Sequence, residues 1–167
     1  MLEQLERVLP SLPDLLADAD GWSSLDVDYH PPRVERLVRA HGSARLCVHR
    51  IHPCPPDTAL FHPHPWPCAI ALLAGRYELG VGYGAGDQAP PLASRLIAHA
   101  PMRYEMLEPD AWHYVRALDA PVLSVMLSGA PWPRSAPRPA QRLEPLPPRA
   151  VESLRQAAAA ALSTHAD

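Results

Sequence analysis

Residues 61–75 read FHPHPWPCAIALLAG and place two histidines, His62 and His64, in a proline-rich setting directly before an apolar run that ends at Gly75. Alternate side chains of an extended chain share a face, so His62 and His64 are predicted to point the same way. The prolines that alternate with them hold the backbone extended, so little conformational entropy is lost when the imidazoles are held in place. Two imidazoles placed in this way can bind one metal ion.

A metal site needs a further ligand, and the best candidate is His113. It lies in residues 108–118, EPDAWHYVRAL, where it follows a turn-like Pro-Asp pair and begins another predicted strand. Each histidine alone also has a plain interpretation as a surface, strand-edge or core residue, and for the HxH pair alone this alternative stays open. Taken together, His62, His64 and His113 predict a metal site.

The sequence around these histidines predicts an all-β domain. Eight short runs rich in β-branched and aromatic residues, each bounded by Gly, Pro or Asp, indicate an antiparallel barrel or sandwich. The runs are residues 34–40, 45–51, 68–74, 76–83, 93–98, 103–107, 112–118 and 121–127.

The remaining segments flank this barrel within one predicted domain. Residues 1–29 are predicted to form an N-terminal helical cap, split into two short helices by prolines, and residues 30–130 to form the barrel. The proline-dense residues 131–148 are predicted to lie extended over the surface. Residues 149–167 are predicted to form a C-terminal helix.

Composition excludes several classes of function. The chain has 167 residues and a net charge of −3, and its basic residues are scattered along the sequence, so no nucleic-acid partner is expected. No apolar run reaches the roughly 20 residues that a membrane span needs. The first residues include acidic side chains and lack the pattern of a secretory signal, and three irregularly spaced cysteines fit free thiols. We therefore predict a cytoplasmic protein.

The spacing of His62, His64, Cys68 and Gly75 resembles the first motif of the cupin superfamily, in which a glutamate stands at the position of Cys68. Residues 109–113, PDAWH, resemble the second cupin motif, although they are one residue short and lack its glycine and its trailing asparagine. The resemblance implies a cupin double-stranded β-helix, also called a jelly-roll barrel, with short N-terminal helices and a C-terminal helix.

Because Cys68 replaces the glutamate ligand, the resemblance is greatest to the thiol dioxygenases typified by cysteine dioxygenase, in which three histidines hold non-haem iron(II). It implies Fe(II) at the three histidines, with Zn, Ni or Mn as alternatives, and dioxygen as a partner. Cys68 is predicted to lie just behind the ligands, but a core residue, a soft metal ligand and a redox-sensitive thiol remain open. Met126 and Ser128 stand where that group has a histidine and a tyrosine, so its cysteine-to-tyrosine crosslink is not expected.

The same resemblance implies an arginine that grips the substrate carboxylate from an early strand, a role that Arg33 or Arg36 could fill. We predict Arg36 and Tyr114 as the groups that orient a small thiol or related chelating substrate. The predicted function is a metal-dependent cupin oxygenase. A non-catalytic cupin that binds a small ligand and a metal-dependent isomerase or lyase remain alternatives. Exposed sheet edges could support a homodimer.

Overall fold

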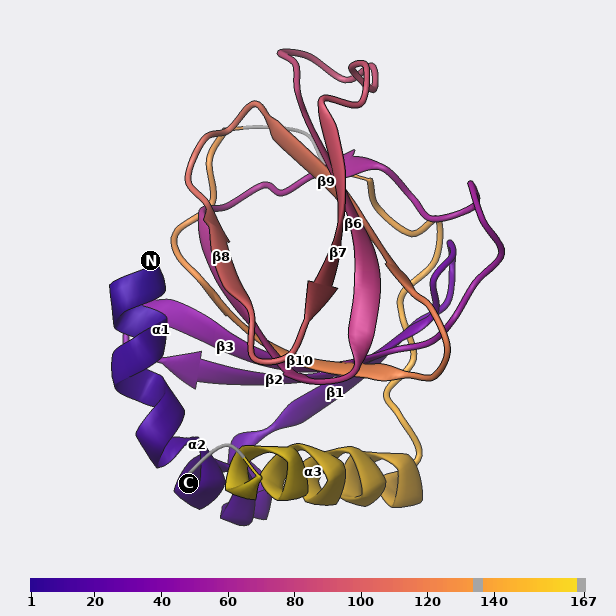
Figure 1. The fold of residues 1–167 in the computed structure, drawn as a ribbon. Coiled ribbons are helices and arrows are strands. Elements are labelled where there is room, and N and C mark those ends of the chain that lie inside the picture. Colours follow the sequence, from indigo (N-terminus) through magenta and orange to yellow (C-terminus); the bar gives the residue numbers. More distant parts are fainter. Residues whose placement is uncertain (134–136, 165–167) are drawn as a thin grey trace.

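The computed structural model describes residues 1–133 and 137–164, which form mainly β-strands with helices at both ends (Figure 1). The helical elements are α1 (Leu2–Val8), η1 (Leu9–Ser11), α2 (Leu12–Ala17), η2 (Ala19–Gly21) and α3 (Pro148–Ser163). The strands are β1 (Ser23–Val27), β2 (Val34–His41), β3 (Ala44–Ile51), β4 (His62–Pro63), β5 (Cys68–Ala74), β6 (Arg76–Tyr83), β7 (Ser94–His99), β8 (Arg103–Met106), β9 (Ala111–Ala117) and β10 (Val122–Ser128).

All eight predicted runs form strands, and two further strands lie outside them. β1 lies within residues 1–29, so the helical part of that segment ends at Gly21 and the rest joins the sheet by pairing with β2. Only two apolar residues alternate within β1, which makes its sequence pattern weak. β4 contains only His62 and Pro63, and it pairs with β9.

The strands form two antiparallel sheets that face each other. One sheet has the order β1-β2-β3-β10-β5-β8, and the other has the order β4-β9-β6-β7. In Figure 1 the strands β6, β7 and β9 stand opposite β2, β3 and β10 across the interior. The prediction of an all-β barrel or sandwich is therefore confirmed.

All three α-helices pack on the side of the six-stranded sheet that faces away from the other sheet (Figure 1). Contacts join α1 to β5, β8 and β10, while α3 contacts β3, β5, β10 and α2. Leu5, Leu12 and Leu154 are fully buried there. Burying a leucine side chain contributes roughly 1.5–3 kcal/mol, so the helices stabilise this face and leave the inner face for a second core and a cavity.

Gly75 forms the turn between β5 and β6 and has a φ of +85°. A Cβ at this position would lie 3.2 Å from Cγ2 of Val122, so both the backbone angle and the space favour glycine. Gly75, the last residue of 61–75, thus allows the chain to turn directly from β5 into β6.

The described part of the proline-rich segment between β10 and α3 contacts the barrel through its backbone. Its described residues carry no helix or strand before α3, which begins at Pro148. The backbone N–H of Trp132 donates to the carbonyl of Pro65 at 2.7 Å, and that of Leu146 donates to Oγ of Ser24 at 3.1 Å. We call residues 131–133 and 137–147 the strap. Within the described part of the chain, no helix is long and apolar enough to cross a membrane.

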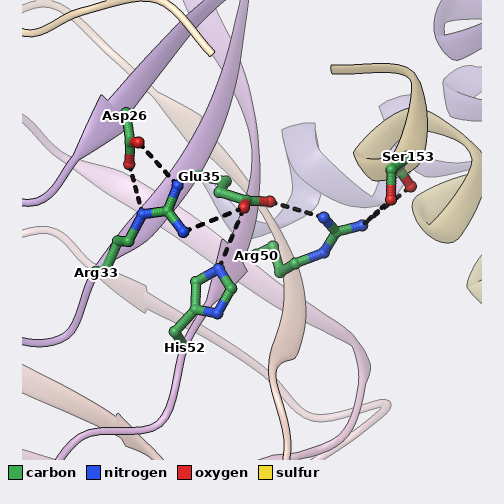
Figure 2. Close-up of polar contacts among 6 residues, drawn as sticks. All are labelled: Asp26, Arg33, Glu35, Arg50, His52 and Ser153. Carbon is green, nitrogen blue, oxygen red and sulfur yellow. Dashed lines mark hydrogen bonds and ion pairs between the residues drawn. The ribbon is translucent and has the colours of Figure 1, made fainter. Parts of the chain in front are cut away.

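An ion-pair cluster joins β2, β3 and α3 on the outer side of the larger sheet (Figure 2). The carboxylate of Glu35 lies 2.7 Å from Arg50 and 3.6 Å from Arg33, and its side chain is only 8% exposed. Arg33 also makes two hydrogen bonds of 2.8 Å to Asp26, while Arg50 donates to the backbone carbonyl of Ser153 in α3 at 3.0 Å. The cluster therefore ties the helix to the sheet.

Replacing Glu35 by glutamine is expected to lower the free energy of unfolding by roughly 2 kcal/mol, because Arg50, whose side chain is only 17% exposed, loses the charge that compensates it, and Arg33 loses one of its two acidic partners. For a chain of this length the melting temperature should fall by about 4–8 °C. Thermal and urea unfolding measure the effect. The control is Glu3→Gln, which removes an exposed pair with Arg7 and should cost less than about 0.5 kcal/mol. Equal effects for the two variants would contradict the role given to the cluster.

Candidate metal centre

Three histidines meet where β4 pairs with β9. His62 lies directly opposite His113 in this pairing, and His64 follows two residues later. The ring centroids are 5.0 Å apart for His62 and His113, 4.5 Å for His64 and His113, and 5.3 Å for His62 and His64. One ligand atom from each histidine lies within 4.8 Å of the other two. The structure thus brings together the three side chains that the sequence analysis groups as ligands.

The hydrogen bonds of the imidazoles leave ring nitrogens free to face a common point. Nδ1 of His62 lies 2.9 Å from the carbonyl oxygen of Leu60, which can only accept, so Nδ1 carries the hydrogen and Nε2 is free for coordination. Nδ1 of His64 lies 3.0 Å from Sγ of Cys68. Nδ1 of His113 is buried and has no hydrogen-bond partner among the described residues.

The spacing of two of these nitrogens is compatible with a divalent ion. Two nitrogens about 2.1 Å from an ion and at right angles to each other are about 3.0 Å apart, whereas tetrahedral ligands at that distance are about 3.4 Å apart. The Nε2 atoms of His64 and His113 are 2.9 Å apart. This separation is compatible with neighbouring positions around an octahedral ion, and it is also a hydrogen-bond distance between the two rings.

Burial keeps the three imidazoles in the form that binds metals. It lowers the pKa of His62 to about 4, despite the hydrogen bond to Leu60, and it lowers the pKa values of His64 and His113 well below 6.5. A metal ligand must be the neutral imidazole. At neutral pH the donor set is therefore uncharged and ready to bind a cation.

Cys68 lies behind His64, on the side away from His113. It is completely buried, and this burial raises the pKa of its thiol to about 12. A thiol with such a pKa stays protonated at neutral pH, whereas a metal ligand has to be a thiolate. Cys68 is thus a buried side chain whose Sγ contacts Nδ1 of His64.

A cavity of about 420 Å³ opens in front of the histidines, between the two sheets and beneath the strap. Its walls combine apolar side chains such as Val34, Ile70 and Val115 with the strap residues Trp132 and Arg138. No aspartate or glutamate is among the described residues that line it. Since the lining includes arginines and no carboxylate, the cavity favours a negatively charged ligand.

Arg36 points from β2 into this cavity. Its Nε–H donates to Nε2 of His49 at 3.0 Å, and no carboxylate of the described chain lies within ion-pair distance of it. Burial lowers the pKa of Arg36 from its usual 12.5, and burial together with the adjacent Arg36 lowers the pKa of His49 well below 6.5. An arginine remains charged at neutral pH, so a cation without a protein counter-ion faces the site. Arg33, the other candidate, lies instead in the outer ion-pair cluster.

Tyr114 lies on the opposite face of β9 from His113. Its ring covers Gly80, where a Cβ would overlap it, and its hydroxyl donates to Oε1 of Glu78 at 2.9 Å. It is not among the residues that line the cavity. Adjacent residues of a strand point to opposite faces, so the inward position of His113 turns Tyr114 outward. The structure does not bring the predicted Tyr114 to the three histidines.

Three other residues in the cavity wall are missing from the sequence prediction. They are His49, which accepts the hydrogen bond of Arg36, and the pair Tyr77 and Tyr104, whose hydroxyl groups are 2.9 Å apart. Alternation places His49 on the same face of its strand as Cys47 and Ile51. That pattern is available in the sequence, but only the pairing of Arg36 with His49 between β2 and β3 shows that they meet.

Comparisons with known proteins bear on the fold. No family model matches the sequence, and no curated protein matches it. The structure of hydroxypropylphosphonic acid epoxidase from S. wedmorenis is similar, with a TM-score of 0.51 at 17% identity, covering 66% of this chain and 56% of that one. The crystal structure of FeII HppE gives a TM-score of 0.52 at 16% identity, covering 66% of this chain and 57% of that one. The match therefore spans little more than half of those longer chains, and it supports the predicted cupin fold without singling out the cysteine dioxygenase type.

Proposed function

We propose that this chain is a metal-dependent cupin enzyme, a non-haem iron(II) dioxygenase that acts on a small chelating substrate with an anionic group. The observation that carries the proposal is the convergence of three neutral imidazoles at one cavity. The same cavity contains Arg36, and no carboxylate is among its described lining residues. A thiol or a related oxygen chelate is the proposed metal-binding part of the substrate.

His62, His64 and His113 would hold the ion, and their donor set guides the choice of metal. Three neutral ligands leave the whole +2 charge on the ion, which favours an anionic substrate donor. Iron(II) at this position would supply oxygen activation, and FeII HppE shares the barrel. Zinc, nickel and manganese are the alternatives that metal analysis has to distinguish.

The remaining groups of the cavity bind and orient the substrate. In the proposal Arg36 donates to the anionic group of the substrate, and His49 holds the guanidinium in place by accepting its Nε–H. The apolar wall and the strap exclude water from the bound substrate. Cys68 maintains the orientation of His64 through the contact with its Nδ1.

A metal-dependent isomerase or lyase on the same barrel is the second candidate, and the tyrosine pair favours it. Tyr77 and Tyr104 both line the cavity, and one hydroxyl donates to the other. Burial raises the pKa of Tyr104 well above 10, so its hydroxyl stays protonated at neutral pH and is suited to donate a hydrogen bond to a substrate oxygen. In an isomerase or lyase such a donor would stabilise the oxyanion that develops on the substrate.

The free cysteines of the described chain support the proposed cytoplasmic location, since a reducing compartment keeps thiols unpaired. The proposal includes dioxygen and a small molecule as partners and leaves the homodimer as a prediction.

Metal analysis combined with oxygen uptake tests the proposed function. Protein purified from its native host is expected to contain about one iron per chain, and oxygen consumption is expected with a small thiol or a diketone. Iron with substrate turnover but no oxygen uptake would favour the isomerase or lyase. A protein that binds no divalent metal would overturn both enzymes and favour the non-catalytic ligand-binding alternative.

A further inference from the structure

A second cavity adjoins the one in front of the histidines. It has a volume of about 450 Å³ and lies between β1, β2, β3 and the part of the strap at residues 142–145. Four residues line both cavities, and they are Arg36, Trp66, Met126 and Leu143. The two spaces are therefore adjacent, and Arg36 is the charged residue that lines both.

Positive charge dominates the second cavity. Arg36, Arg45 and Arg142 line it, and Glu144 is the one acidic residue among its described lining residues. The guanidinium of Arg45 is 4.1 Å from the centroid of the Trp66 ring, which holds its flat group at the cavity wall. The whole chain carries a net charge of −3, so this excess of arginines is local and does not follow from composition.

Arg36 has N–H donors that are available to ligands in both cavities. A guanidinium carries five N–H donors, and the hydrogen bond to His49 uses only the one on Nε. A carboxylate or phosphonate that binds in a fork uses two of the remaining four. The hydroxyl of Ser23 donates to the carbonyl of Val38, whereas Oγ of Ser24 accepts from the backbone N–H of Leu146, so the O–H of Ser24 can donate to an anion beside the arginines.

We propose that the second cavity is a distal anion subsite of the same active site, and that the substrate carries two anionic groups, each a carboxylate or a phosphonate. One group binds Arg36 beside the histidines, and the other extends past Arg36 to Arg45 and Arg142. The shared apolar side chains Met126 and Leu143 suit the short hydrocarbon part between the two groups. This inference rests on the proposed function, since it names the substrate class of that site.

Titration calorimetry on the metal-free protein tests the subsite with defined probes. The probes are succinate, glutarate, adipate and 3-phosphonopropionate, with butyrate as the matched monoanion. At least one of the dianions is expected to bind 10-fold or more tightly than butyrate. In the double variant Arg45→Gln/Arg142→Gln, the affinity for that dianion should fall to the butyrate level while butyrate binding stays unchanged. Comparing 3-phosphonopropionate with the dicarboxylates shows which anionic group the subsite prefers.

The control is Arg7→Gln, which removes one exposed arginine of α1 and should leave all affinities unchanged. Equal binding of butyrate and every dianion, no binding of any probe, or an unchanged dianion preference in the double variant would overturn the proposal. Iron binding measured on the same preparations separates the two hypotheses. Intact iron binding without a dianion preference rejects the subsite alone, whereas a dianion preference without metal binding rejects the proposed oxygenase.

Discussion

Replacing His113 by alanine is expected to abolish metal binding. Even partners that only orient a ligand contribute 10–100-fold to metal affinity, so the loss of one of three ligands should weaken affinity by more than about 100-fold. We expect the iron content to fall from about one per chain to near zero, together with substrate-dependent oxygen uptake. Metal analysis by mass spectrometry and an oxygen electrode measure the two effects.

His99→Ala is the matched control for this experiment, because His99 is an exposed histidine at the end of β7. It should retain both metal and activity. Circular dichroism and thermal unfolding establish that His113→Ala still folds. If the folded His113→Ala variant kept its metal with unchanged affinity, the three-histidine site would be wrong.

Replacing Arg36 by glutamine is expected to weaken binding of the anionic substrate by about 100-fold, or ~2.7 kcal/mol, because a charge-assisted hydrogen-bonded pair is lost. The KM for substrate should rise while the iron content stays unchanged, because Arg36 is not a ligand. Arg36→Lys retains the charge but loses the forked geometry of the guanidinium. The KM of this variant should therefore lie between those of the wild type and Arg36→Gln. Steady-state oxygen uptake and metal analysis together measure these changes.

Arg7→Gln serves as the control for charge alone, since Arg7 lies on the exposed side of α1 and pairs with Glu3. It should leave KM unchanged. A normal KM in Arg36→Gln would show that the substrate anion binds elsewhere in the cavity. Loss of iron in Arg36→Gln would instead indicate that the arginine maintains the metal centre, contrary to the proposal.

The strands could be predicted because each is a local pattern. Runs such as residues 68–74 and 121–127 contain apolar and β-branched residues bounded by turn formers, and all eight such runs form strands. β1 could not be predicted in this way, because its five residues contain only two alternating apolar side chains. Strand β1 is held in place by its pairing with β2, which is a tertiary contact.

The histidines show the same division between local and tertiary information. The spacing of His62 and His64 is local, and a resemblance in the second motif was enough to add His113. Alternation also predicts that Tyr114 and His113 point to opposite faces, but it does not say which face is the inner one. The prediction of Tyr114 as a cavity residue is therefore not met, because its ring packs on Gly80 outside the cavity.

The sequence by itself determined the all-β class, the flanking helices and the three histidines, because each depends on short-range periodicity, proline placement or a compact motif. Tertiary structure decided which of Arg33 and Arg36 lines the cavity. The register of β2 against β3 turns Arg36 toward His49 and leaves Arg33 in the outer ion-pair cluster. Tertiary structure also decided the charge of the cavity, which arises from residues of β2, β3 and the strap that are far apart along the chain. Which side chains share an enclosed space depends on the pairing of strands and the closure of the barrel, and neither is a local property of the sequence.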